Sequence, residues 1–142
     1  MRSVVFALLG LIAGADTAQA QAWLSVADAN GRFRLEMPVP FDSPPSQIAP
    51  DGTVTFAYVH ETPDLALRFE VIDHGAAMHD LPMSVSPMPI SRLWDSERMV
   101  QMRYHVVGRR TYRVVAIFPP ELEGDATILR FMRSVRYNDM AD

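Results

Sequence analysis

The chain contains no cysteine and no lysine among its 142 residues. The absence of cysteine excludes a disulfide framework, a zinc ribbon, an iron–sulfur cluster and any cysteine nucleophile. All 13 basic residues are arginines. Without lysine the chain cannot form a Schiff base through a lysine side chain. It also lacks the lysine with which a phosphate-binding loop contacts its nucleotide. These absences exclude several classes of cofactor and covalent chemistry.

A strong positive charge is missing as well. The formal net charge is −4 at pH 7 and the sequence pI is about 5.5. No basic surface is therefore predicted, and we expect no nucleic-acid partner. The glycine-rich patterns of dinucleotide and phosphate binding are also absent, so the sequence does not support nucleotide binding.

Residues 1–20 have the layout of a secretory signal peptide. Arg2 supplies the positive start, residues 4–13 form an apolar run, and Ala18-Gln19-Ala20 offers small residues for cleavage. The apolar run is about ten residues long, whereas a membrane-spanning helix needs about 20. We therefore expect residues 1–20 to be cleaved and the mature chain, 21–142, to be periplasmic or secreted without a transmembrane span.

The mature chain has the length of a single domain, and it shows period-two alternation of apolar and polar residues in several stretches. This alternation predicts strands at 33–37, 53–60, 65–71, 100–106 and 112–118. Short connections at 61–64 and 108–110 join the last four into two hairpins. The apolar positions expected to face the core are Phe33, Leu35, Met37, Val54, Phe56, Tyr58, Leu65, Leu67, Phe69, Val71, Val100, Met102, Tyr104, Val106, Tyr112, Val114, Ala116 and Phe118.

The last segment changes to helical spacing. Apolar residues between Ile128 and Val135 recur at this spacing, and Asp125 stands where an N-cap is expected. We predict a helix from about Asp125 to about Arg133. The predicted fold class is α+β: an antiparallel β-sheet of about five to seven strands with a C-terminal α-helix packed on one face.

Two stretches show neither the two-residue alternation of a strand nor the spacing of a helix. Residues 38–50 carry five prolines and are predicted to be an extended connection. Residues 75–90 hold three prolines and three methionines and are predicted to be a long loop. Loops of this length are commonly functional or mobile in compact domains.

Four features of the chain form a recognisable series: Trp23, the segment Gly31–Pro38, the late strand 108–114 and the closing helix segment Phe131–Val135. In these features the chain resembles the small exported bacterial proteins of PsbP-like α+β fold. The resemblance implies an accessory role beside larger assemblies and supplies no catalytic set. Family members place a helix between the two hairpins, where this chain has the proline-rich residues 75–90. Either one layer is thinner here or a partner covers what that helix would cover.

No set of residues for catalysis can be assembled from the sequence. The G-x-S-x-G turn of serine hydrolases is absent, and the acidic residues are scattered over predicted turns and outward strand positions. We expect no enzymatic activity and no resident cofactor.

Histidine and methionine residues between positions 74 and 88 suggest an alternative role. His74, Met78, His79 and Met83 offer imidazole and thioether ligands, a combination that suits Cu(I). The alternative function is thus a periplasmic copper-binding protein that uses the 74–88 loop. Methionine also fills irregular apolar gaps, and we favour that packing interpretation.

Three residues of the final hairpin form a candidate ligand site. Arg103 and Arg113 are expected to project from it, with His105 on the same strand face as Arg103, and Arg109 and Arg110 are further candidates. Arginine binds carboxylates and phosphates with two parallel hydrogen bonds, so an anionic ligand is one interpretation. Cross-strand pairing with acidic neighbours is the other, and we favour it.

The exposed sheet face together with the methionine-containing loop 75–90 is a third candidate, as a protein-docking surface. Trp94, Met99 and Tyr104 lie close together in the sequence, and these residue types are enriched at protein interfaces. Packing of Trp94 over the core is the alternative explanation. Taken together, the sequence predicts an exported, non-catalytic binding or accessory module with a protein partner in the cell envelope.

Overall fold

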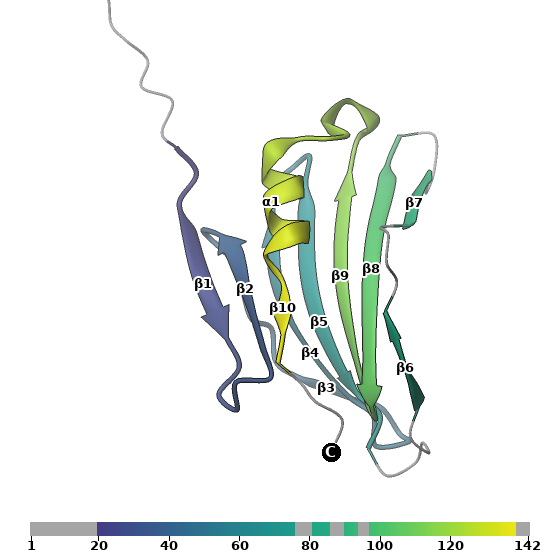
Figure 1. Cartoon of the computed structure of the whole chain (residues 1–142). Helices are drawn as coiled ribbons and strands as arrows, with labels where there is room; N and C mark the ends of the chain where they lie inside the picture. The colour runs from purple at the N-terminus through teal and green to yellow at the C-terminus, as the bar shows by residue number, and fades with distance from the viewer. Residues whose placement is uncertain (1–19, 76–80, 86–89, 94–96, 139–142) are drawn as a thin grey trace, which may run out of the picture.

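The computed structural model describes residues 20–75, 81–85, 90–93 and 97–138. Its secondary structure confirms the predicted α+β class, with antiparallel sheets and one α-helix near the C-terminus (Figure 1). The predicted signal peptide lies outside the described residues except for Ala20, so its cleavage stays a prediction. No helix in the described ranges is long and apolar enough to span a membrane.

The strands form two sheets. The small sheet has the order β1 (Trp23–Ala27), β2 (Phe33–Pro38), β10 (Arg136–Tyr137). The large sheet has seven strands. Six of them follow the order β3 (Gln47–Ile48), β4 (Val54–Glu61), β5 (Ala66–Asp73), β9 (Arg110–Phe118), β8 (Met99–Gly108), β6 (Leu81–Val85). The seventh strand, β7 (Ile90–Leu93), also pairs with β8. The strand predicted at 33–37 therefore belongs to a separate small sheet.

Helix α1 (Ala126–Ser134) follows the short 3₁₀ helix η2 (Pro120–Leu122). The predicted N-cap is present, because an Asp125 carboxylate oxygen accepts a hydrogen bond from the Thr127 backbone N–H at 2.8 Å. Helical spacing brings Ile128, Phe131 and Met132 to one side, where all three are buried. The helix thus begins where the sequence predicts and buries its apolar side.

The core lies between the large sheet on one side and the small sheet with α1 on the other. The Phe33 ring of β2 lies 4.8 Å from the Phe69 ring of β5, measured between centroids. Phe131 of α1 belongs to the same buried cluster. We call the side of the large sheet that meets this layer the covered face.

Antiparallel pairing determines which residues share each face of the large sheet, because directly opposite residues point the same way. The covered face carries Val54, Phe56, Tyr58, His60, Leu67, Phe69, Val71, Asp73, Met99, Gln101, Arg103, His105, Val107, Arg110, Tyr112, Val114, Ala116 and Phe118. The opposite side, which we call the open face, carries Thr55, Ala57, Val59, Glu61, Ala66, Arg68, Glu70, Ile72, Val100, Met102, Tyr104, Val106, Thr111, Arg113, Val115 and Ile117.

The sequence prediction assigned the apolar residues of β8 to the wrong face of the sheet. Val100, Met102, Tyr104 and Val106 were expected to face the core, but they lie on the open face. The covered face of β8 instead carries residues such as Arg103 and His105, which find partners on α1 and β10. Period-two alternation identifies residues that share a face, and it does not say which face is covered.

The predicted loop at 75–90 is also partly wrong. Residues 81–85 form β6 and Ile90 begins β7, and both strands pair with β8. Pro82 fits such a position because β6 ends the pairing order of the large sheet, and proline is tolerated in edge strands. No α-helix is present between the hairpins within the described residues.

Candidate functional site

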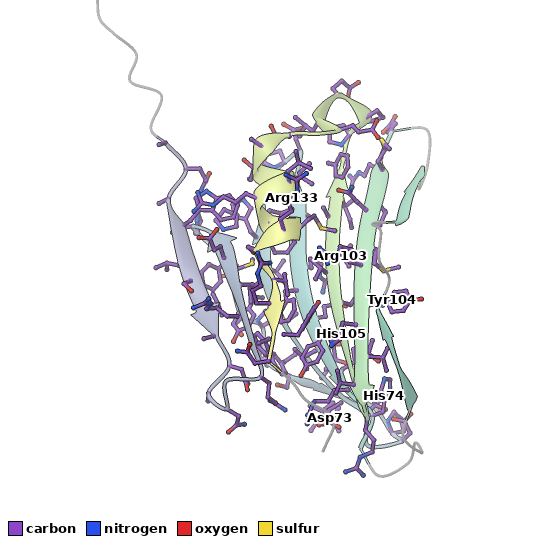
Figure 2. The ribbon with its side chains drawn as sticks, in the orientation of Figure 1. Asp73, His74, Arg103, Tyr104, His105 and Arg133 are labelled. Atoms are coloured by element: carbon purple, nitrogen blue, oxygen red, sulfur yellow. The ribbon has the colours of Figure 1, made fainter. Side chains whose placement is uncertain are left out.

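The structure separates the three residues of the predicted ligand site. Arg103 and His105 share the covered face, as expected, whereas Arg113 lies on the open face beside Tyr104. Figure 2 shows the positions of Arg103, Tyr104 and His105 along β8. β8 and β9 place Arg103 and Arg113 on opposite faces of the large sheet, so the structure does not bring these two arginines together. One ligand cannot contact all three residues.

Arg103 has a structural contact at the end of α1. Its Nη1 donates a hydrogen bond of 2.8 Å to the backbone carbonyl of Met132. The last carbonyls of a helix have no partners within the helix, and they carry its partial negative charge. A cation at this position therefore stabilises the helix end.

His105 belongs to a buried aromatic stack. Its ring lies 4.2 Å from the Tyr137 ring and 6.1 Å from the Tyr112 ring, and only 8% of the residue is exposed. Burial raises the pKa of Tyr137 to about 12, while the nearby Arg103 cation acts in the opposite direction. This phenol therefore keeps its proton at neutral pH, and the stack joins β8 and β9 to β10.

The predicted copper ligands are only partly described. His74 follows β5, and its Nε2 lies 3.1 Å from the Thr111 hydroxyl. Met83 lies in β6, while Met78 and His79 lie outside the described residues. Within the described part of the chain, no three histidine, aspartate or glutamate residues come together as a metal site. Copper binding stays an untested prediction.

The open face holds a charge cluster that sequence reasoning missed. Glu70 is only 6% exposed and lies between two arginines. Its Oε2 accepts a hydrogen bond of 2.5 Å from Arg113 Nε and also pairs with Arg113 Nη2, while its Oε1 lies 3.4 Å from Arg68 Nη2. Each arginine side chain keeps 42% exposure. We call Arg68, Glu70 and Arg113 the central charge cluster.

The residues around this cluster are mostly apolar. Glu70 faces Ala57 on β4, Arg68 stands between Val59 and Val115, and Arg113 faces Tyr104. The rest of the open face adds mainly aliphatic side chains, which are Ala66, Ile72, Val100, Met102, Val106 and Ile117. The cluster carries one net positive charge in this apolar surround.

No described element covers this face. The small sheet, α1 and η2 all contribute residues to the core on the covered face. Every other described strand is part of the large sheet itself. The open face is therefore without an opposing layer within the described ranges. One signal in the sequence could have predicted the open face. It is the alternating apolar series at 100–106, which belongs to the same hairpin as Arg113.

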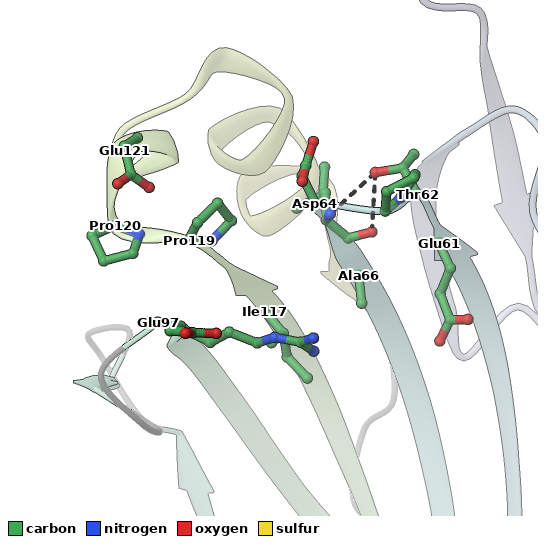
Figure 3. Close-up of a pocket in the computed structure, with 12 residues that line it drawn as sticks. Glu61, Thr62, Asp64, Ala66, Glu97, Ile117, Pro119, Pro120 and Glu121 are labelled. Carbon is green, nitrogen blue, oxygen red and sulfur yellow. Dashed lines mark hydrogen bonds between the residues drawn. The ribbon is translucent and has the colours of Figure 1, made fainter.

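A hollow of about 570 Å³ lies at one end of the large sheet (Figure 3). The Thr62 hydroxyl shapes the β4–β5 turn beside it, since it accepts a hydrogen bond of 3.1 Å from the Leu65 N–H. The charged residues that line the hollow are Glu61, Asp64, Glu97, Arg98 and Glu121. Its acidic residues are Glu61, Asp64, Glu97 and Glu121, and among the described residues no three acidic or histidine side chains come together as a metal site.

Comparisons of the chain with protein-family models, with curated proteins and with solved structures gave no match. The resemblance to PsbP-like proteins therefore stays a prediction.

Proposed function

We propose that the chain is an exported, non-catalytic accessory module that docks a protein partner through the open face of its large sheet. The observation that carries this proposal is the central charge cluster, which lies in an apolar face without an opposing layer of described residues. Arginine, tyrosine and methionine, which are enriched at protein interfaces, all stand on this face.

The charges define the chemistry of the partner. Glu70 can neutralise one of its two flanking arginines, so one positive charge is left over in the cluster. We infer a partner whose docking surface places a carboxylate among apolar side chains. Apolar contact supplies affinity by removing surface from water, and the carboxylate supplies specificity by meeting the remaining guanidinium donors.

The PsbP-like resemblance supports the same role, because it implies an accessory subunit. In that family a helix stands between the two hairpins, and the segment at this point of the present chain contains the edge strand β6. A partner that covers the open face would provide the missing layer.

Site-specific photocrosslinking in native cells tests the proposal. A photoreactive amino acid replaces Met102 on the open face, and a matched variant carries it at Arg133, which is exposed on α1 in the opposite layer. We expect Met102 to give one discrete adduct with a protein whose crosslinked segment contains an acidic residue, and Arg133 to give none.

The adduct should also disappear when Arg113→Gln is combined with the Met102 probe, while Arg109→Gln, an exposed arginine in the β8–β9 turn, should leave it unchanged. No adduct at Met102, the same adduct at Arg133, or an adduct with a second copy of this chain would each contradict the proposal.

A further inference from the structure

A pair of arginines stands on the outer side of the small sheet, away from the open face. β10 pairs with β2 so that Arg136 lies directly opposite Arg34. Directly opposite residues of antiparallel strands share a face, with Cβ atoms about 4.5–5.5 Å apart, and like charges in such pairs repel each other. This pairing therefore destabilises the sheet unless a negative charge lies between the two side chains.

The two arginines line a common hollow of about 380 Å³. Its other lining residues are Ser25, Leu35, Glu36 and Ser134. The hollow thus combines two guanidinium groups with two hydroxyl groups, one on β1 and one at the end of α1. Such donors match the oxygen atoms of phosphate and carboxylate groups.

The one acid of this hollow is already engaged. Arg130 donates two hydrogen bonds to the Glu36 carboxylate, from Nε to Oε2 at 2.9 Å and from Nη2 to Oε1 at 3.2 Å. The guanidinium of Arg130 also lies 4.4 Å from the centre of the Trp23 ring, which holds it in place. Glu36 is therefore neutralised by Arg130 and does not compensate the arginine pair.

The hydroxyl of Ser134 is engaged as well. It accepts a hydrogen bond of 3.0 Å from the Glu36 N–H and donates one of 2.9 Å to the Phe131 carbonyl. These bonds fix the end of α1 on β2 and give the hollow a rigid wall. Ser25 is exposed on β1 directly opposite Glu36, and its hydroxyl makes no hydrogen bond within the described residues.

The donors of the two arginines are available. The Arg34 side chain is exposed and makes neither a hydrogen bond nor an ion pair within the described part of the chain. Arg136 uses its Nη1, which donates to the carbonyls of Arg133 and Val135 at 2.5 and 2.9 Å. Its Nε and Nη2 are left for another acceptor. The hollow therefore presents two positive charges with free donors.

We propose that Arg34 and Arg136, with the Ser25 hydroxyl, form a binding site for a doubly charged oxyanion of the phosphate type. The two guanidinium forks would each donate to the oxyanion oxygens and Ser25 would add a hydroxyl donor. The bound charge would also remove the repulsion between the arginines and so stabilise the small sheet. This site does not depend on the docking proposal, because it lies on a different sheet.

Calorimetric titration of the purified protein with inorganic phosphate tests the site, at about pH 7.5 where phosphate is mostly a dianion. The ionic strength is held constant with sodium chloride, and acetate serves as a singly charged comparison. We expect one phosphate per chain, with weaker binding of acetate. The variants Arg34→Gln and Arg136→Gln should each weaken phosphate binding about tenfold or more, since each loses a charged hydrogen-bond donor.

Arg34→Gln is the decisive variant, because Arg136 also holds the helix end. Arg109→Gln removes the same charge from the β8–β9 turn and should leave binding unchanged. Without phosphate, Arg34→Gln should raise the melting temperature by relieving repulsion, and phosphate should then stabilise only the parent protein. Arg34→Lys keeps the charge without the fork and should bind with intermediate affinity.

A second arm asks where the phosphate comes from. The protein is mixed with vesicles of phosphatidic acid in phosphatidylcholine. If the parent protein binds these vesicles and both arginine variants do not, the site is supported with a lipid headgroup as its ligand. Retention of free phosphate alone would support it with a small molecule as ligand. The proposal is overturned if no phosphate binds at ~10 mM or if Arg109→Gln weakens binding equally.

Discussion

At the scale of single residues, Glu70 is the one buried carboxylate among the described residues. A buried charge is tolerated when opposite charges and hydrogen bonds surround it, and Arg68 and Arg113 supply both. The same contacts order two arginine side chains on the open face. Glu70 thus links the stability of the large sheet to the chemistry of the proposed docking surface.

Replacing Glu70 with glutamine keeps the shape of the side chain and removes its charge. Both arginines then lose their compensating negative charge, so we expect Glu70→Gln to lower the free energy of unfolding by about 1–3 kcal/mol. Urea denaturation measures this loss. Glu61→Gln, an exposed site at the end of β4, should change stability by less than about 0.5 kcal/mol. Equal effects at the two sites would contradict this account of the cluster.

Tyr137 makes stability depend on pH in the alkaline range. Its pKa is about 12 in the folded protein, while an unfolded tyrosine has its ordinary pKa near 10. Between these values the folded state keeps a proton that the unfolded chain has lost. The free energy of unfolding should therefore fall as pH rises, by up to ~1.4 kcal/mol per pH unit.

Denaturation curves of the parent protein and of Tyr137→Phe across this range measure the effect. The parent should lose more stability than the variant as the solution becomes more alkaline. Burial also raises the pKa of Tyr58, so the variant keeps part of the dependence. Parallel curves for the two proteins would show that Tyr137 is not the group responsible.

At the scale of elements, α1 depends on the contact at its first turn. Asp125→Ala removes the acceptor for the Thr127 N–H and should destabilise the protein by about 1 kcal/mol. Glu123→Ala, an exposed position just before the helix, serves as the matched control. A stability change no larger than that of the control would mean that Asp125 does not cap the helix.

Prediction from sequence succeeded where one periodic series is clearly more apolar than the other. Residues such as Leu67 and Phe69 of β5 alternate with charged ones, and the apolar set faces the core. In β8 the same reasoning chose the wrong face, because apolar residues such as Met102 lie on the open face while Arg103 reaches a helix carbonyl. Tertiary partners decided the orientation, and no local pattern contains them.

Short strands were missed for a related reason. β3 and β10 have two residues each, and they exist because β4 and β2 offer edges for pairing. The Arg34–Arg136 pair depends on the short pairing of β10 with β2. Because the two residues are distant in sequence and share no motif, the sequence alone does not predict this pair. Glu70 and Arg113 are likewise brought together by the β5–β9 register.

At the scale of the whole molecule, the two sides of the large sheet differ. One side meets the small sheet and α1, which bury an aromatic and aliphatic core. The other carries apolar side chains around the central charge cluster without an opposing layer among the described residues. The proposed docking of a partner on the open face would account for this asymmetry.

The absence of cysteine permits the most direct test of this claim, because a single cysteine can be placed and labelled without background. Met102→Cys puts a thiol on the open face, and Arg133→Cys puts one on α1. Maleimide labelling is then compared between intact cells and the purified protein. If a partner covers the open face, Met102→Cys reacts more slowly in cells while Arg133→Cys reacts equally in both. Equal labelling of Met102→Cys in cells and in purified protein would contradict the account.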